Sequence, residues 1–144
     1  MSIELRPLRF WRHWLVCWRL GADPTERAMS LDPSPPTIGK HTCWMLRQRF
    51  NPRHRAWIIY SSDKPVGRVR LTFGDVAEVH ITLLPEARGK GTGTVALRRV
   101  VRMWSPVPYM ARIKRGNQPS IRAFENAGFK VESITADYVR MVHP

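Results

Sequence analysis

The sequence predicts one mixed α/β domain, and two observations carry this prediction. Three segments rich in β-forming residues follow one another through short turns between residues 55 and 84, which indicates an antiparallel meander. From residue 77 onward the order becomes strand, helix, strand, helix, strand, which favours parallel neighbouring strands. The chain has 144 residues, 43% of them hydrophobic and 24% charged, with no internal repeat or linker. We therefore expect a single domain over residues 1–144.

The N-terminal third is expected to supply one strand and two helices. Residues 3–8 alternate apolar and polar side chains, which predicts a short edge strand. Apolar side chains at helical spacing predict a helix over 10–20 that ends at Gly21. Residues 27–39 are rich in Ser, Asp and Pro and predict a loop, or a short helix between loops. Residues 42–50 again have a helical pattern.

The remainder of the chain supplies the meander and the alternating half. The meander consists of strands over 55–60, 66–73 and 77–84. The expected elements after it are a helix over 95–104, a strand over 109–114, a helix over 117–127, and strands over 129–132 and 137–142.

Charge is the most unusual feature of the composition. The formal net charge is +13, from 24 basic and 11 acidic residues, which predicts an anionic partner such as a phosphate-rich small ligand or a nucleic acid. Cys17 and Cys43 form no CxxC pair, so we expect neither a disulfide framework nor a zinc ribbon, and a reducing cytoplasmic compartment fits best. The five histidines have no metal-ligand spacing, so no metal is expected. No apolar run approaches the roughly 20 residues of a membrane span, and a secretory leader pattern is absent.

The most informative segment is a glycine-rich turn between the strand that ends at residue 84 and the next helix. Glycines 89, 91 and 93 allow positive φ and close approach of a ligand to the main chain. The helix that follows presents free N–H groups and the positive end of its dipole, a combination that binds phosphate. Arg88 and Lys90 add positive charge beside the turn.

Two ordered motifs resemble those of the GCN5-related N-acetyltransferases (GNAT). Arg88, Gly91 and Gly93 match the acetyl-CoA signature Arg/Gln-x-x-Gly-x-Gly/Ala, and residues 117–129 resemble the second motif, Asn-x-x-(Ser/Ala)-x-x-x-(Tyr/Phe)-x-x-x-Gly-Phe. The resemblance covers about Trp57 to Val142. It implies a GNAT-like fold with a central mixed sheet flanked by helices. It also implies an enzyme that moves acetyl from acetyl-CoA, its co-substrate, to a primary amine.

The resemblance also implies where coenzyme A is held. The main chain of Leu83 and Leu84 is expected to pair with the pantetheine arm as an added strand does. Asn117 is expected to cap its helix and contact the same arm, and Phe124 to pack on the cofactor. The turn residues expected to bind coenzyme A are Arg88, Gly89, Lys90, Gly91, Thr92, Gly93 and Thr94.

Candidate catalytic residues lie on the strand before the turn. Glu78 and His80 share one face of it, about 7 Å apart. Glu78 matches the glutamate base of the histone-acetylating members of the family and ranks first, whereas His80 is the better base on its ordinary pKa. Alternatively, both are polar residues of a solvent-facing strand. Phe124 stands where the family has its usual tyrosine acid, so water, Tyr109 or Tyr138 would have to protonate the thiolate.

The acceptor is the least defined part of the prediction. Trp18-Arg19 and residues 23–27 resemble a segment of a subgroup that acetylates amino sugars carried on nucleotides, so such a sugar is the leading acceptor. A protein or peptide amine is second, and a basic nucleic-acid-binding module without catalysis is the alternative from another class. Monomer and dimer both remain open.

Aromatic and basic side chains are the candidates for the acceptor cleft. Trp11 and Trp44 are expected to line it, with the other tryptophans packed in the core: Trp14, Trp18, Trp57 and Trp104. A cluster of arginines would either face solvent or hold a diphosphate: Arg47, Arg49, Arg53 and Arg55.

Overall fold

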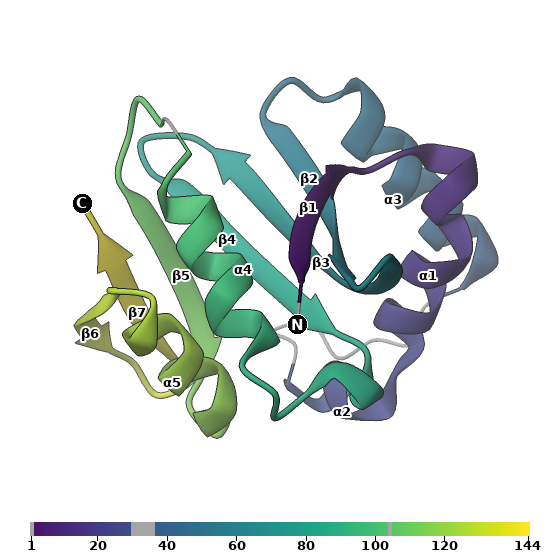
Figure 1. Cartoon of the computed structure of the whole chain (residues 1–144). Helices are drawn as coiled ribbons and strands as arrows, with labels where there is room; N and C mark the ends of the chain where they lie inside the picture. The colour runs from purple at the N-terminus through teal and green to yellow at the C-terminus, as the bar shows by residue number, and fades with distance from the viewer. Residues whose placement is uncertain (1, 30–36, 104) are drawn as a thin grey trace.

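A computed structural model describes residues 2–29, 37–103 and 105–144, and within them the chain forms a seven-stranded mixed sheet flanked by helices (Figure 1). The predicted α/β class is confirmed. The elements in chain order are β1 (Ile3–Pro7), α1 (Phe10–Ala22), α2 (Pro24–Met29), α3 (Ile38–Phe50), β2 (His54–Ser61), β3 (Lys64–Phe73), β4 (Ala77–Leu83), the short 3-10 turn η1 (Pro85–Ala87), α4 (Thr92–Val101), β5 (Tyr109–Lys114), α5 (Gln118–Asn126), β6 (Lys130–Ile134) and β7 (Tyr138–His143).

The strand order is β1-β2-β3-β4-β5-β7-β6. The predicted meander is confirmed, because β1 to β4 pair antiparallel in sequence order. β4 and β5 are parallel neighbours as expected, but the register pairs only Ala77 with Tyr109 and Glu78 with Met110. The two strands then diverge toward their C-terminal ends (Figure 1). The prediction that the last strands are also parallel neighbours is wrong, because β7 folds back between β5 and β6 and pairs antiparallel with both.

Helix ends differ from the predicted ones for local reasons. Helix α1 continues through Gly21 to Ala22, just before Pro24. Helix α3 begins at Ile38 rather than 42, because the side chain of Thr37 caps it by accepting the Lys40 N–H at 3.2 Å. Part of the loop expected over 27–39 is therefore helical, whereas residues 30–36 lie outside the described residues.

The helix after the glycine turn is also shifted. Helix α4 begins at Thr92 and ends at Val101, instead of spanning 95–104, because Gly91 already serves as its N-cap. Trp104, expected in the core, lies outside the described residues.

The sheet buries both of its faces. Val69, Leu71 and Val79 pack with apolar residues of α4 and α5 on one face. On the other face, Ile58 and Tyr60 pack against α1 and Met45 of α3. Alternate residues of each strand thus belong to different layers, as the period of two requires. Trp14 packs against the α1 side and Trp57 against the α4 side, as predicted, and Trp18 is half-buried and stacks on Trp14.

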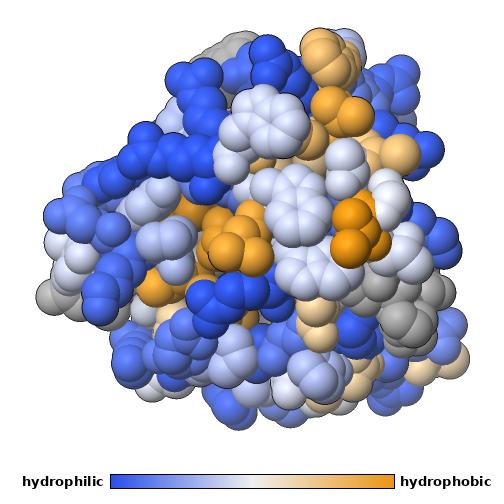
Figure 2. Space-filling model, turned by 90° about the vertical axis from the view of Figure 1, so that its right-hand side faces the viewer, coloured by the Kyte–Doolittle hydropathy of each residue, from blue (hydrophilic) through white to orange (hydrophobic). Residues whose placement is uncertain are grey.

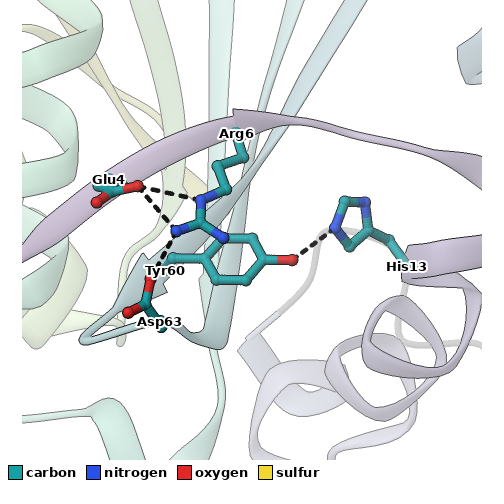
Figure 3. A network of polar contacts seen from close by, with 5 residues as sticks. All are labelled: Glu4, Arg6, His13, Tyr60 and Asp63. Atoms are coloured by element: carbon teal, nitrogen blue, oxygen red, sulfur yellow. Dashed lines mark hydrogen bonds and ion pairs between the residues drawn. The ribbon is translucent and has the colours of Figure 1, made fainter.

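A network of polar contacts joins β1 to β2 and α1 (Figure 3). The N–H of Arg9 donates to His13 Nδ1 at 2.8 Å, so Nε2 carries the proton of the neutral ring and donates to the Tyr60 hydroxyl at 2.9 Å. The Arg6 guanidinium lies 4.1 Å from the Tyr60 ring centroid and donates to Asp63 at 2.8 Å. Burial lowers the pKa of His13, which keeps the ring neutral.

The outer surfaces of α1 and α3 carry exposed apolar side chains among hydrophilic ones (Figure 2). These side chains are Trp11, Leu15, Ile38, Leu46 and Phe50. Trp11 is 85% exposed. No helix in the described residues is both long and apolar enough to cross a membrane.

Candidate active site

The glycine turn has the conformation that the sequence predicts. Gly89 and Gly91 adopt φ of 73° and 79°, which other residues rarely tolerate. Gly91 is the N-cap of α4, and its C=O accepts the N–H of Val95 at 3.1 Å. The N–H groups of the first helical turn have no acceptor one turn earlier in the helix. Gly93 and Thr94 lie in that turn, half-buried, whereas Thr92 is buried. The turn therefore fits an anion such as a diphosphate.

The two basic side chains of the turn differ in their surroundings. The Arg88 guanidinium donates to Asp23 at 2.8 Å and to the C=O of Leu83 at 2.9 Å. Its hydrogen bond lowers the pKa of Asp23 below the ordinary value. Arg88 thus joins the turn to β4 and to Asp23, between α1 and α2, and does not present a free charge, contrary to the sequence prediction. Lys90 is exposed beside the turn.

The end of β4 offers main chain to a ligand at one of the two predicted positions. The N–H of Leu84 donates to Val66 at 2.8 Å, and its C=O accepts the N–H of Ala87 at 2.9 Å. The prediction that Leu84 pairs with the pantetheine arm is therefore corrected. Antiparallel ladders alternate, so the N–H of Leu83 points away from β3, toward the side where β4 and β5 have separated. Leu83 keeps the geometry that an added strand requires.

A cavity of about 990 Å³ extends from the sheet face that α1 and α3 cover, past β4 and β5, to α5. We call it the basic cavity, because among its described lining residues seven are basic and one, Glu26, is acidic. The basic ones are Arg27, Lys40, Arg47, Arg68, Arg70, Arg112 and Lys114. Its volume suits a small molecule.

Only some of the residues predicted for the cleft line this cavity. Trp44 and Arg47 do, whereas Trp11 is absent from its lining and exposed, which corrects the expectation for Trp11. Of the two alternatives for the arginine cluster, the solvent-facing one holds for Arg49, Arg53 and Arg55, which are exposed and absent from the lining.

The two predicted residues of the second motif also reach the cavity. Asn117 caps α5 by accepting the Ser120 N–H at 3.3 Å, as predicted, and lines the cavity. Phe124 lines it from the core, where it is 2% exposed and packs edge-on against Phe129.

Glu78 and His80 lie side by side on β4. His80 Nε2 is 3.2 Å from Glu78 Oε1, and the Arg112 guanidinium makes bonds of 2.5 and 3.1 Å to the two carboxylate oxygens. Burial raises the pKa of Glu78, but the hydrogen bonds from His80 and Arg112 outweigh it and bring the pKa to about 2. Burial, Arg70 and Arg112 lower the pKa of His80 in spite of Glu78. The pair therefore consists of an ionised carboxylate and a neutral imidazole near pH 7.

Arg68 and Arg70 are site residues that the sequence prediction missed. In the β3–β4 register Arg70 pairs with His80 and Arg68 with Thr82, so all four side chains share the cavity face. Burial and Arg68 bring the pKa of Arg70 down to about 10. The alternation of residues 66–73 placed both arginines on one face, but nothing in the sequence indicated that this face is the one with His80.

Glu26 was also missed. The Thr82 hydroxyl donates to Glu26 Oε1 at 3.2 Å, which brings α2 onto β4. Burial raises the pKa of Glu26, partly opposed by Arg68 and by the Thr82 hydrogen bond. Because 56 residues separate the two partners, no local pattern could reveal the contact.

The tyrosines considered as proton donors are not placed for that role. Tyr109 is 4% exposed and its hydroxyl bonds to main-chain oxygens of Val100 and Met103, which rules it out as the acid. Tyr138 packs beside Arg112, with the guanidinium 5.8 Å from the ring centroid, and is absent from the cavity lining. In the described residues no cluster of three His, Cys, Asp or Glu side chains has metal-site geometry.

A glycine turn before a helix, a splayed strand pair and a cavity across β4 agree with the resemblance in the sequence. The family model described as an acetyltransferase (GNAT) domain matches residues 3–130. The chain belongs to the GNAT acetyltransferase family. Membership makes this GNAT protein an acetyl-CoA-dependent N-acetyltransferase, as the motifs predicted. A search of the curated proteins finds no match.

Solved structures share the whole fold with this GNAT protein. An acetyltransferase from Thermus thermophilus is 20% identical with a TM-score of 0.83, over 100% of this chain and 97% of the other. The enzyme AAC(6')-Ib, in complex with paromomycin and acetyl-CoA, is 19% identical with a TM-score of 0.83, over 99% and 93%. A spermidine N-acetyltransferase from Vibrio cholerae, in complex with CoA and spermine, is 17% identical with a TM-score of 0.81, over 98% and 94%.

Proposed function

We propose that this acetyltransferase acetylates a primary amine held in the basic cavity, with His80 taking the proton from the amine. The observation that carries the proposal is a neutral imidazole that lines the cavity and is anchored by a carboxylate. In the neutral ring Nε2–H donates to Glu78, so the lone pair is on Nδ1. A base of this kind typically contributes 10²–10⁴-fold to a reaction rate.

Acetyl-CoA supplies a thioester carbonyl: the amine nitrogen bonds to its carbon, the C–S bond breaks and the sulfur leaves as a thiolate. His80 holds the amine proton on Nδ1, and its positive charge is then stabilised by the ionised Glu78. The thiolate takes its proton from water, because Phe124 has none to give and the Tyr109 hydroxyl is bound in the core.

Glu78 is proposed as the residue that positions His80, and this reverses the order of the sequence prediction. With a pKa of about 2 and two bonds from Arg112, Glu78 is a poor proton acceptor at neutral pH. Glu26, whose pKa is raised and which faces the cavity, is proposed to bind the ammonium form of the acceptor before its proton is removed.

The turn at residues 88–94 and the N–H of Leu83 are proposed to hold coenzyme A. The positive φ of Gly89 and Gly91 and the position of Gly93 and Thr94 in the first turn of α4 support the first, and the divergence of β4 from β5 supports the second.

The proposed acceptor is an amino sugar carried on a nucleotide. A diphosphate carrier matches the charge of the basic cavity, and the segment at residues 23–27 that suggested this class places Glu26 and Arg27 in its lining. Kanamycin and spermine, which occur in complexes of the structural neighbours, are polycations near pH 7 and match this charge poorly.

Release of free coenzyme A over a panel of amines tests the acceptor. The panel contains a nucleotide-linked amino sugar, kanamycin, spermine and a lysine peptide. We expect the nucleotide-linked sugar to have the highest kcat/KM. A higher kcat/KM for kanamycin or spermine would refute the acceptor, and a higher value for the peptide would favour a protein amine instead.

The pH profile of kcat tests the roles of His80 and Glu78. Activity should fall as the pH decreases through the pKa of His80. Glu78→Gln removes the group that raises this pKa, so the acidic limb should move to lower pH. If the acidic side of the pH profile has the same midpoint in the parent chain, in Glu78→Gln and in His80→Gln, His80 is not the base.

A further inference from the structure

Two arginines in the basic cavity, Arg68 and Arg70, stand out because they are half-buried and their charges are not matched, whereas Lys40 and Arg47 are exposed. Arg112 is paired with Glu78, and Lys114 donates to the C=O of Ala28 at 2.8 Å. For Arg68 and Arg70, neither an ion pair nor a hydrogen bond to a carboxylate occurs within the described residues. The Nε of Arg70 is buried without a hydrogen-bond partner in that part of the chain.

The groups that face these arginines do not match their charges. The thiol of Cys17 is hydrogen-bonded to Arg68, but burial raises the pKa of this thiol, so it stays neutral. Trp44 offers its ring, with the guanidinium carbons of Arg68 and Arg70 at 4.5 and 5.6 Å from the centroid. The nearby acids are already engaged, Glu26 by Thr82 and Glu78 by Arg112 and His80. Two like charges two residues apart repel each other, and burial adds a desolvation cost. The cation–π contacts with Trp44 offset only part of these costs, which points to a ligand.

An oxyanion is the ligand that fits. A guanidinium presents a planar fork of N–H donors that matches the oxygens of a phosphate or carboxylate. A second guanidinium beside it adds positive charge and further donors. Both guanidiniums lie over the ring of Trp44, and these cation–π contacts limit their movement. Diphosphate binding at residues 88–94 is a separate feature, since that turn lies beyond β4 at the start of α4.

We propose that Arg68 and Arg70, held against Trp44, form a subsite that binds an oxyanion carried by the acceptor amine. The inference rests on the proposed function, because it places the anion in the cavity with His80. Arg70 lies directly across the ladder from His80, with Cβ atoms about 5 Å apart, and Arg68 lies about 7 Å further along β3. The substrate class is therefore an amine that carries a phosphate or carboxylate within reach of these two arginines, as a nucleotide-linked amino sugar does through its diphosphate.

Titration of inorganic phosphate into the coenzyme A complex tests the subsite without catalysis. Saturating coenzyme A occupies the turn at residues 88–94, so calorimetry then reports other anion sites. The control is Arg99→Gln, an exposed arginine on α4 at the opposite sheet face. We expect Arg68→Gln and Arg70→Gln to weaken phosphate binding about 10- to 100-fold, as loss of one charge-assisted contact does, and Arg99→Gln to leave it unchanged. Equal affinity in all four proteins would overturn the subsite.

Thermal melts of the same variants separate binding from folding. Loss of an unmatched buried charge should leave the Tm of Arg70→Gln equal to or above that of the parent chain. A large fall in Tm would show that the arginine is structural, and would contradict the proposal. Arg70→Lys keeps the charge but lacks the fork, so it should fold and bind phosphate more weakly.

Three amines with the same two-carbon spacer distinguish the source of the anion: ethanolamine, O-phosphoethanolamine and β-alanine. We expect kcat/KM to be at least ten times higher for the phosphate or the carboxylate compound than for ethanolamine, and the ratio to approach one in Arg68→Gln and Arg70→Gln. A ratio near one in the parent chain would refute the subsite. A last outcome separates the two proposals. If none of these three amines and no amine of the acceptor panel causes release of coenzyme A from acetyl-CoA, while phosphate still binds, the proposed function fails and the anion subsite stands.

Discussion

The cofactor turn and the basic cavity lie at either side of β4, and they are built in opposite ways. The turn is one contiguous segment, residues 88–94, in which Gly89 and Gly91 have positive φ, and we propose that it binds coenzyme A through main-chain N–H groups. The cavity is assembled from residues of α1, α2, α3, α5, β3, β4 and β5. A contiguous main-chain site leaves a motif in the sequence, whereas a side-chain site depends on which strands become neighbours.

This difference predicts that mutations on each side of β4 affect different substrates. The largest effect is expected on the acceptor side. His80→Gln should lower kcat about 10²- to 10³-fold, because the amine loses its base, while the dissociation constant for acetyl-CoA stays the same. Steady-state kinetics and calorimetry measure the two quantities.

His54→Gln is the matched control for this variant, since His54 also lies on a strand but is absent from the cavity lining. It should leave kcat within about two-fold, as expected for a residue that is not part of a functional site. Similar losses in both variants would remove His80 from the chemistry.

The cofactor side should respond with a change in acetyl-CoA binding. Gly91→Ala forces a Cβ onto a residue with φ of 79°, at a cost of about 1–2 kcal/mol. Main-chain N–H groups then move, so the KM for acetyl-CoA should rise about ten-fold while the acceptor KM changes little.

Gly21→Ala provides the control. Gly21 lies inside α1 with open space around its Cβ position, so alanine should stabilise the chain by up to about 1 kcal/mol. If Gly21→Ala also raised the KM for acetyl-CoA, the turn would not be the origin of the effect.

The two sides are joined by Arg88, and a smaller effect on both substrates is expected there. Arg88→Gln breaks the contact with Asp23, whose carboxylate also accepts the Glu26 N–H at 3.0 Å. We expect both KM values to rise a few-fold, because the turn and Glu26 lose a shared support.

Arg19→Gln removes an exposed ion pair with Glu86 at 3.1 Å and serves as the control. Solvent screens an exposed ion pair and leaves it little net effect, so both KM values should hardly change. An effect of Arg88→Gln on acetyl-CoA alone would show that the turn and the cavity are not coupled through this residue.

The smallest expected effect is a decrease in the stability of the whole fold at acidic pH. Burial lowers the pKa of His13, His41, His54 and His80 below the ordinary value near 6.5. Between that value and the lower folded pKa, the unfolded chain binds more protons, so stability is lost as the pH falls below about 6.5. Urea unfolding at pH 8 and at pH 5.5 should show a lower free energy of unfolding at pH 5.5, and equal values would contradict the pKa directions.

The sequence predicted the contiguous features well. The meander and the glycine turn follow from residues within a few positions of each other, so local chemistry determines them. Helix starts were misplaced where a single cap decides them, at Thr37 and Gly91.

Features that depend on distant contacts were missed. The position of β7 between β5 and β6 follows from pairing that no local pattern encodes. Leu84 was expected to bind the cofactor, but its N–H is taken by Val66 on the neighbouring strand. Arg68, Arg70 and Glu26 became visible as site residues only when β3 and α2 were placed beside β4.

Amide hydrogen exchange of the chain with and without coenzyme A tests the central claim most directly. If main-chain N–H groups of residues 88–94 donate hydrogen bonds to the diphosphate, their exchange should slow on addition of coenzyme A. Exchange of the Leu83 N–H should also slow. The N–H of Leu84, already bonded to Val66, should change little. Protection confined to another part of the chain, with residues 88–94 unchanged, would contradict the account.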